Sequence, residues 1–190
     1  MKGSATMITN GAPAMTPGVR FTERNGTDRW RYDVVNSPLG ELLLVSDGDS
    51  LVGLHLEKPA GPNALPPAWR HDRGATREVA EQLAGYFAGE VQSFDLPVAP
   101  GGTEFQRAVW AALTEIPYGS TASYRDVAEA IGRPRATRAV GGANHVNPVA
   151  IIVPCHRVVG ADGSLTGYGG GLERKALLLE LEHEVLVGAR

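Results

Sequence analysis

Short apolar runs alternate with clusters of turn residues in the first half of the chain. Between Trp30 and Glu57 three runs, "RWRYDVV", "GELLLVSD" and "SLVGLHLE", are rich in aliphatic and β-branched residues, and "NSPLG" and "DGDS" separate them. Runs of this length bounded by turn residues are typical of strands joined by hairpins. The pattern therefore predicts a small antiparallel three-stranded sheet.

The hydrophobic spacing becomes helical after a long loop rich in Pro, Gly and Ala. In the stretch "ATREVAEQLAGYFAGE", Val79, Leu83, Tyr86 and Phe87 fall on one face of a helix. A helix with one apolar face buries that face against another element. We expect it to cover one side of the sheet.

Helix-start signals dominate the second half of the chain. Thr103 with Gln106 three residues later forms a capping box, and Ser123 with Asp126 can cap a second helix. Gly132 ends that second helix, and a proline two residues later opens a third segment, "RATRAVGGANHVN". A short helix, a tight turn and a second helix together suggest a helix-turn-helix.

These patterns divide the chain. We expect an N-terminal α/β domain at 29–92, an extended linker at 93–102 ("SFDLPVAPGG") and a mostly helical C-terminal domain at 103–190. The fold class is α+β. Residues 1–28 are small, polar and without periodicity, and they predict a mobile leader, part of which could be an expression-vector scar.

Gly141 and Gly142 lie in the middle of the third helical segment. Each glycine costs a helix roughly 1 kcal/mol relative to alanine. The pair therefore indicates a place where another backbone comes close, either from the protein or from nucleic acid. Packing within the protein is the more common reason.

Composition and charge exclude disulfide-rich and multi-thiolate zinc proteins. The chain has 190 residues, a formal net charge of −3 and one cysteine, so it carries no intramolecular disulfide and no zinc site of several thiolates. We expect a soluble cytoplasmic protein with no membrane segment. Five arginines against two acids between Ser120 and Gly160 give this stretch +3 and leave −6 elsewhere. A modest cationic face is available on an acidic protein.

The lone Cys155 follows the apolar run at 151–154 and precedes His156 and Arg157. A single cysteine is usually a small buried hydrophobe. Here the run predicts a buried, strand-like approach to a sharp turn, and a neighbouring cation or base would lower the pKa of the thiol. Arg157 would be costly at this place unless it has a partner. From the residues alone, a buried cysteine and a reactive one are both open.

Four stretches, "SYRDVA", "ATRAVGGAN", "NPVAIIVPCHRVVG" and "GYGGGLERKALLLELE", resemble the O6-alkylguanine-DNA alkyltransferases in the same order. The resemblance is dense from Phe105 to Glu182 and looser over the N-terminal strands. It implies a winged helix-turn-helix and irreversible, stoichiometric transfer of an alkyl group from O6-alkylguanine in duplex DNA to the protein's own cysteine. It implies no cofactor and no metal, and a monomer in solution with possible cooperative assembly on DNA.

The resemblance assigns roles to the catalytic residues. Cys155 would accept the alkyl group, and His156 would act through a water as its base, with Glu182 orienting the imidazole. Asn147 would steady the active-site turn. Tyr124 would crowd the target phosphate and help to protonate the leaving guanine.

The resemblance also assigns a DNA surface and a substrate pocket. Arg138 would enter the duplex and fill the space left by the extruded nucleotide. The remaining DNA-binding positions would be Ser123, Arg135, Ala139, Gly141 and Gly142. The pocket would be walled by Val153, Pro154, Tyr168 and Gly169.

Two other functions fit parts of the sequence. A helix-turn-helix regulator, or an alkyltransferase-like protein that binds lesions without repair, would need no reactive Cys155. A Cys-His hydrolase would explain Cys155 and His156. It would leave Tyr124, the arginine-bearing helix and the paired glycines unexplained.

Overall fold

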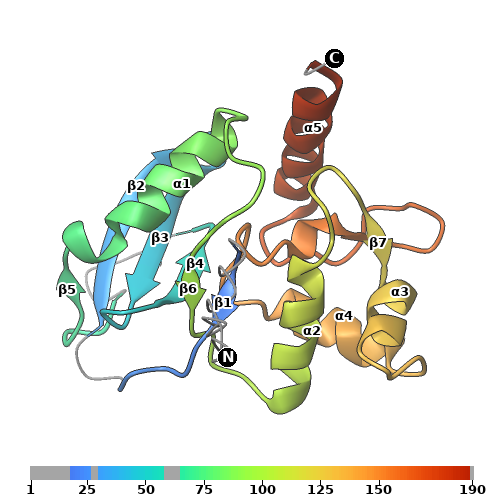
Figure 1. Ribbon diagram of the computed structural model, residues 1–190, viewed down its shortest axis with the longest axis horizontal. Coiled ribbons are helices and arrows are strands. Elements are labelled where there is room, and N and C mark those ends of the chain that lie inside the picture. Colours follow the sequence, from blue (N-terminus) through green and yellow to red (C-terminus); the bar gives the residue numbers. More distant parts are fainter. Residues whose placement is uncertain (1–17, 27–29, 58–64, 189–190) are drawn as a thin grey trace, which may run out of the picture.

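The computed structural model describes residues 18–26, 30–57 and 65–188. A sheet with one helix packed on it lies beside a group of helices, and the C-terminal helix stands apart from the sheet (Figure 1). The strands are β1 (Arg20–Phe21), β2 (Arg31–Ser37), β3 (Gly40–Ser46), β4 (Leu51–His55), β5 (Arg70–His71), β6 (Pro97–Val98), β7 (Ala122–Ser123) and β8 (Val158–Val159). The α-helices are α1 (Arg77–Phe87), α2 (Glu104–Thr114), α3 (Tyr124–Ala130), α4 (Thr137–His145) and α5 (Leu172–Gly188). Two 3₁₀ turns are η1 (Gly74–Thr76) and η2 (Cys155–Arg157).

The three predicted hairpin strands are confirmed as β2, β3 and β4, which pair antiparallel in sequence order. The sheet has six strands among the described residues, in the order β1-β6-β4-β3-β2-β5, so the expectation of three was too small. The added strands are two residues long and pair parallel to their neighbours. A two-residue strand has no alternation to read in a sequence.

The expected leader and linker both take part in this sheet. Arg20–Phe21 of the first pairs with Pro97–Val98 of the second. The leader prediction is therefore wrong for these residues, while residues 1–17 and 27–29 lie outside the described part of the chain.

Strand β3 is apolar on both faces, because Leu42 and Leu44 join the main core while Leu43 and Val45 join a smaller cluster on the other face. Helix α1 covers the main-core face with Val79, Leu83 and Tyr86, as predicted. This core continues without a break into the C-terminal part. The two halves share one hydrophobic interior.

Both predicted capping boxes are present, at Thr103 for α2 and at Ser123 for α3. Gly132, at φ +69°, follows the end of α3 in the left-handed conformation that glycine adopts easily. Helices α2, α3 and α4 pack on one another, and the short parallel pair β7–β8 lies next to α3.

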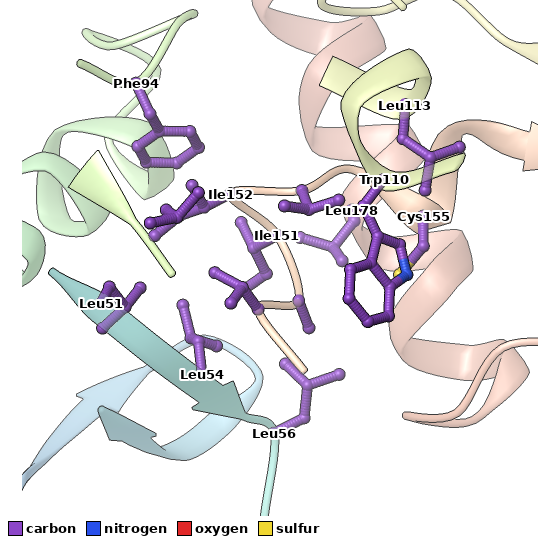
Figure 2. Close-up of a cluster of buried hydrophobic side chains, with 14 of the residues drawn as sticks. Leu51, Leu54, Leu56, Phe94, Trp110, Leu113, Ile151, Ile152, Cys155 and Leu178 are labelled. Atoms are coloured by element: carbon purple, nitrogen blue, oxygen red, sulfur yellow. The ribbon is translucent and has the colours of Figure 1, made fainter. Parts of the chain in front are cut away.

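The run before Cys155 is not the predicted strand. Leu54 of β4 bonds to the segment on both sides, from its N–H to Pro148 O at 2.8 Å and from Ala150 N–H to its own O at 3.3 Å. The chain then turns at Ile151, whose φ of +71° is the only positive one outside glycine among the described residues. Figure 2 shows Ile151 and Ile152 beside the side chains of β4. Burial, rather than strand pairing, explains the apolar run.

Candidate active site

Asn144 of α4 and Asn147, two residues after the end of this helix, hold the turn that carries Cys155. Asn147 donates from Nδ2 to Val153 O at 2.8 Å and to Cys155 Sγ at 3.0 Å. Asn144 donates from Nδ2 to the Cys155 carbonyl at 3.2 Å. Asn147 thereby holds the sulfur and Asn144 holds the backbone of the same residue, and Cys155 is buried.

Burial raises the pKa of the Cys155 thiol to about 11, although the hydrogen bond from Asn147 and the nearby charge of Lys175 act to lower it. The expectation of a lowered pKa is therefore wrong for this protein, because desolvation outweighs both neighbours. At neutral pH the free protein holds a thiol. A base must remove its proton before the sulfur can react.

The fully buried His156 meets Glu182 of α5, with Nε2 2.8 Å from Oε1. Burial lowers the pKa of His156 in spite of this carboxylate, so the ring is neutral at pH 7. In the neutral ring Nε2 carries the proton that it donates to Glu182, which leaves Nδ1 as an acceptor. Nδ1 has no hydrogen-bond partner among the described residues. This is the state that a general base requires.

Glu182 is fully buried, whereas the neighbouring Glu180 and Glu184 are exposed. Arg157 binds both of its carboxylate oxygens, through Nε at 3.2 and 3.1 Å and through Nη2 at 2.9 Å. Burial alone would raise the pKa of this carboxyl, but His156 and Arg157 hold it at about 2. Arg157 thus has the partner that its position after an apolar run demands.

Lys175 of α5 is also fully buried, and the sequence patterns did not single it out as a site residue. Its Nζ donates to Val158 O and, at 2.8 Å, to Thr166 O. Lys175, Leu178 and Glu182 share one face of α5, so a single helix face delivers both buried charges to the turn. The spacing was visible in the sequence, but charged residues at those positions usually indicate a solvated face.

The helix-turn-helix presents its polar residues to solvent. Arg138 and Arg135 are exposed, and Arg138 has no hydrogen-bond or ion-pair partner within the described part of the chain. Tyr124, the first residue of α3, donates its hydroxyl to Thr166 O at 3.1 Å. Lys175 donates to the same carbonyl, so both side chains hold this loop.

The paired glycines of α4 are not required by packing. A β-carbon at Gly142 would meet nothing within 4 Å, and one at Gly141 would meet the Tyr124 ring at an ordinary 3.8 Å. The expectation that the protein's own packing explains them is wrong. Contacts within the described residues therefore do not account for glycine at these two positions.

Three of the four predicted pocket residues line cavities that the described residues form. Tyr168 and Gly169 line a cavity of about 280 Å³ together with Asn147, on the side of the turn that faces β4. Pro154 lines a different cavity of about 420 Å³ beside Arg157. Val153 is fully buried behind the turn.

Two family models match the chain. "6-O-methylguanine DNA methyltransferase, DNA binding domain" matches residues 104–184, and the ribonuclease-like domain of the same methyltransferase matches residues 30–100. The chain belongs to the 6-O-methylguanine DNA methyltransferase family. The predicted family and fold class are thereby confirmed.

The alignments with relatives in this family span nearly the whole length of those relatives. The methylated-DNA–protein-cysteine methyltransferase of Methanosarcina barkeri is 50% identical over 155 residues, which are 82% of this chain and 98% of the relative. That of Mycobacterium bovis is 52% identical over 152 residues, 80% of this chain and 91% of the relative. The crystal structure of Mycobacterium tuberculosis OGT in complex with DNA matches with a TM-score of 0.75 at 48% identity, covering 83% of this chain and 94% of that one.

The described part of the chain offers neither a cluster of metal ligands nor a membrane span. No group of three or more His, Cys, Asp or Glu side chains there could hold a metal ion. Among the same residues, no helix combines the length and apolar character that crossing a bilayer requires.

Proposed function

We propose that this chain repairs duplex DNA by moving the alkyl group of O6-alkylguanine to Sγ of Cys155, once per molecule. The observation that carries the proposal is the buried Cys155 thiol next to the His156–Glu182 pair. A neutral histidine held by a carboxylate is a suitable base for a thiol that burial keeps protonated. The relatives are named for methylated DNA and the matching family model for 6-O-methylguanine, which supports this substrate class.

The reaction balances without a cofactor. Nδ1 of His156 takes the thiol proton through a bridging water, and the thiolate attacks the saturated carbon in line. The S–C bond forms as the C–O6 bond breaks, and the guanine leaves as an anion. Tyr124 donates a proton to that anion and is reprotonated by solvent, while the proton on His156 returns to solvent. The net products are a thioether and unmodified guanine.

The thioether explains why one molecule would act once. A saturated C–S bond has no hydrolytic exit, and the His156–Glu182 pair offers no group that could reverse the transfer. Apart from the bridging water, the buried Cys155 is shielded from bulk solvent.

The alkylated base has to leave the helix before it can meet a buried sulfur, because a stacked base cannot approach it. Extrusion of a nucleotide costs a few kcal/mol. The exposed Arg138 would occupy the vacated space and offset part of this cost. The bare surface at Gly142 would let α4 approach the DNA backbone closely.

The substrate pocket belongs to the same proposal. Tyr168 and Gly169 would wall the side of the cavity next to Asn147, and Val153 and Pro154 would support the turn from behind rather than contact the base. We also propose that the protein acts in the cytoplasm and is a monomer in solution. Sedimentation with and without DNA checks the assembly state.

The deciding experiment is intact-protein and peptide mass spectrometry after incubation with excess duplex carrying one O6-methylguanine. One added methyl group on the Cys155 peptide, with no further turnover, is the expected result. Cys155→Ala should bind the same duplex and gain no mass. An unchanged mass in spite of tight binding would favour a lesion-binding protein. Repeated turnover of small esters would favour a hydrolase.

A further inference from the structure

A side chain from the N-terminal domain reaches the catalytic carboxylate. Tyr86 of α1 is fully buried, and its hydroxyl donates to Oε1 of Glu182 at 2.8 Å across a separation of 96 residues. Burial and the nearby Glu182 raise the pKa of this phenol, so the hydroxyl stays protonated and acts as a donor. The ring is held by Phe94 and Tyr118, whose centroids lie 5.4 and 5.9 Å away.

Tyr86 shares its acceptor with the catalytic base. Oε1 of Glu182 accepts from Tyr86 Oη, from His156 Nε2 and from Arg157 Nη2, at 2.8, 2.8 and 2.9 Å. Oε2 accepts from Gly119 N–H at 2.9 Å and from Arg157 Nε. Arg157 Nε also donates to Oε1, at 3.2 Å, so the oxygen that orients the imidazole divides its negative charge among donors from three side chains.

We infer that Tyr86 is a positioning residue for alkyl transfer: its hydroxyl fixes the Glu182 carboxylate against His156, so the N-terminal domain takes part in proton transfer at Cys155. The inference rests on the proposed function for its consequence in the reaction. The hydrogen bond itself gives this domain a role beyond covering the core.

The sign of the effect follows from the charges around the pair. His156 is faced by Glu182 and Lys175 of α5 and by Arg157 of η2, and Glu182 is faced by Tyr86 of α1 and by Tyr118. Removing the Tyr86 donor concentrates charge on Oε1. The carboxylate then stabilises the imidazolium better, and the pKa of His156 rises.

The test compares two hydroxyls of one aromatic cluster. Tyr86→Phe removes the donor to Glu182, whereas Tyr118→Phe removes a buried hydroxyl that has no partner among the described residues. NMR titration of His156 in the free protein should show its pKa raised by about half to one unit in Tyr86→Phe, the size of one hydrogen bond. Tyr118→Phe should leave it unchanged.

Alkyl transfer supplies a second readout. The acid limb of the rate profile should move to higher pH in Tyr86→Phe by the same half to one unit, so that the rate at a given pH on this limb falls by about three- to tenfold. Because neutral His156 is the active form, both changes have the same sign. Equal pH profiles for the two variants would overturn the inference.

3-Fluorotyrosine at position 86 gives the opposite perturbation without changing shape. Its hydroxyl is a stronger donor, so the pKa of His156 should fall, which a purely structural role of the ring would not produce. This variant also keeps the test open if Tyr86→Phe does not fold. If the wild type transfers no alkyl group, the proposed function fails, while the His156 titration still decides the role of Tyr86.

Discussion

Arg157→Met tests whether the buried ion pair holds the active-site turn. Arg157 donates three times to Glu182 and once, from Nη1 at 2.7 Å, to Ile116 O. Its side chain is 8% exposed and that of Glu182 is 0% exposed. Methionine has a similar length and fills the space of the stem, so the substitution removes the charge and donors without opening a large cavity.

The expected loss follows from the remaining charge. Removing one partner of a buried ion pair costs about 3–5 kcal/mol, because the other charge stays buried without compensation. For a chain of this size, each kcal/mol lowers the melting temperature by about 2–4 °C. The melting temperature of Arg157→Met should therefore fall by about 6–20 °C at pH 7.

Thermal unfolding followed by circular dichroism measures this fall. Arg20→Met is the matched control, because Arg20 pairs with Asp95 at the surface, with side chains 38% and 48% exposed, where solvent screens the interaction. It should melt close to the wild type. If Arg157→Met also melted within about 2 °C of the wild type, less than the 6 °C minimum, Glu182 would not depend on Arg157.

Three further predictions concern acid stability, base extrusion and the recognition helix. The pKa of Glu182 in the folded protein is about 2, below its ordinary 4.5. The ionised carboxylate therefore stabilises the fold fully above pH 4.5, and this stability is lost as the pH falls toward 2. In Glu182→Gln the unfolding free energy should depend less on pH between 4.5 and 2. Arg138→Ala should slow repair of duplex DNA far more than reaction with free O6-methylguanine, and equal losses in stopped-flow rates would remove its role in extrusion. Gly142→Ala should raise the unfolding free energy by about 1 kcal/mol, because the site is open, and still weaken duplex binding in a fluorescence titration.

Short-range sequence patterns were sufficient to predict many of the helices and strands. The hairpin strands, the capping boxes at Thr103 and Ser123 and the apolar face of α1 depend on residues close in the chain, so spacing and turn chemistry were sufficient to predict them. The resemblance around Cys155 gave the family, which the family models confirm. The same information placed Glu182, rather than Glu180 or Glu184, toward the core.

Contacts between distant segments were decided only in the folded chain. The pairing of Arg20–Phe21 with Pro97–Val98 and the bond from Tyr86 to Glu182 leave no periodic trace, because each involves one or two residues far apart in sequence. The turn at Ile151 could not be predicted from the sequence, because a buried turn and a buried strand both use apolar residues.

The electrostatics of the site also required tertiary structure. The sequence sets a cation next to Cys155, which suggested a lowered thiol pKa, but desolvation is set by everything packed around the sulfur, and it raises the pKa instead. Arg157 forms its ion pair with Glu182 and does not act on the nearby thiol of Cys155. The sequence by itself thus determined which chemical groups meet at the turn, while the tertiary structure decided their protonation, because burial is a property of the assembled core.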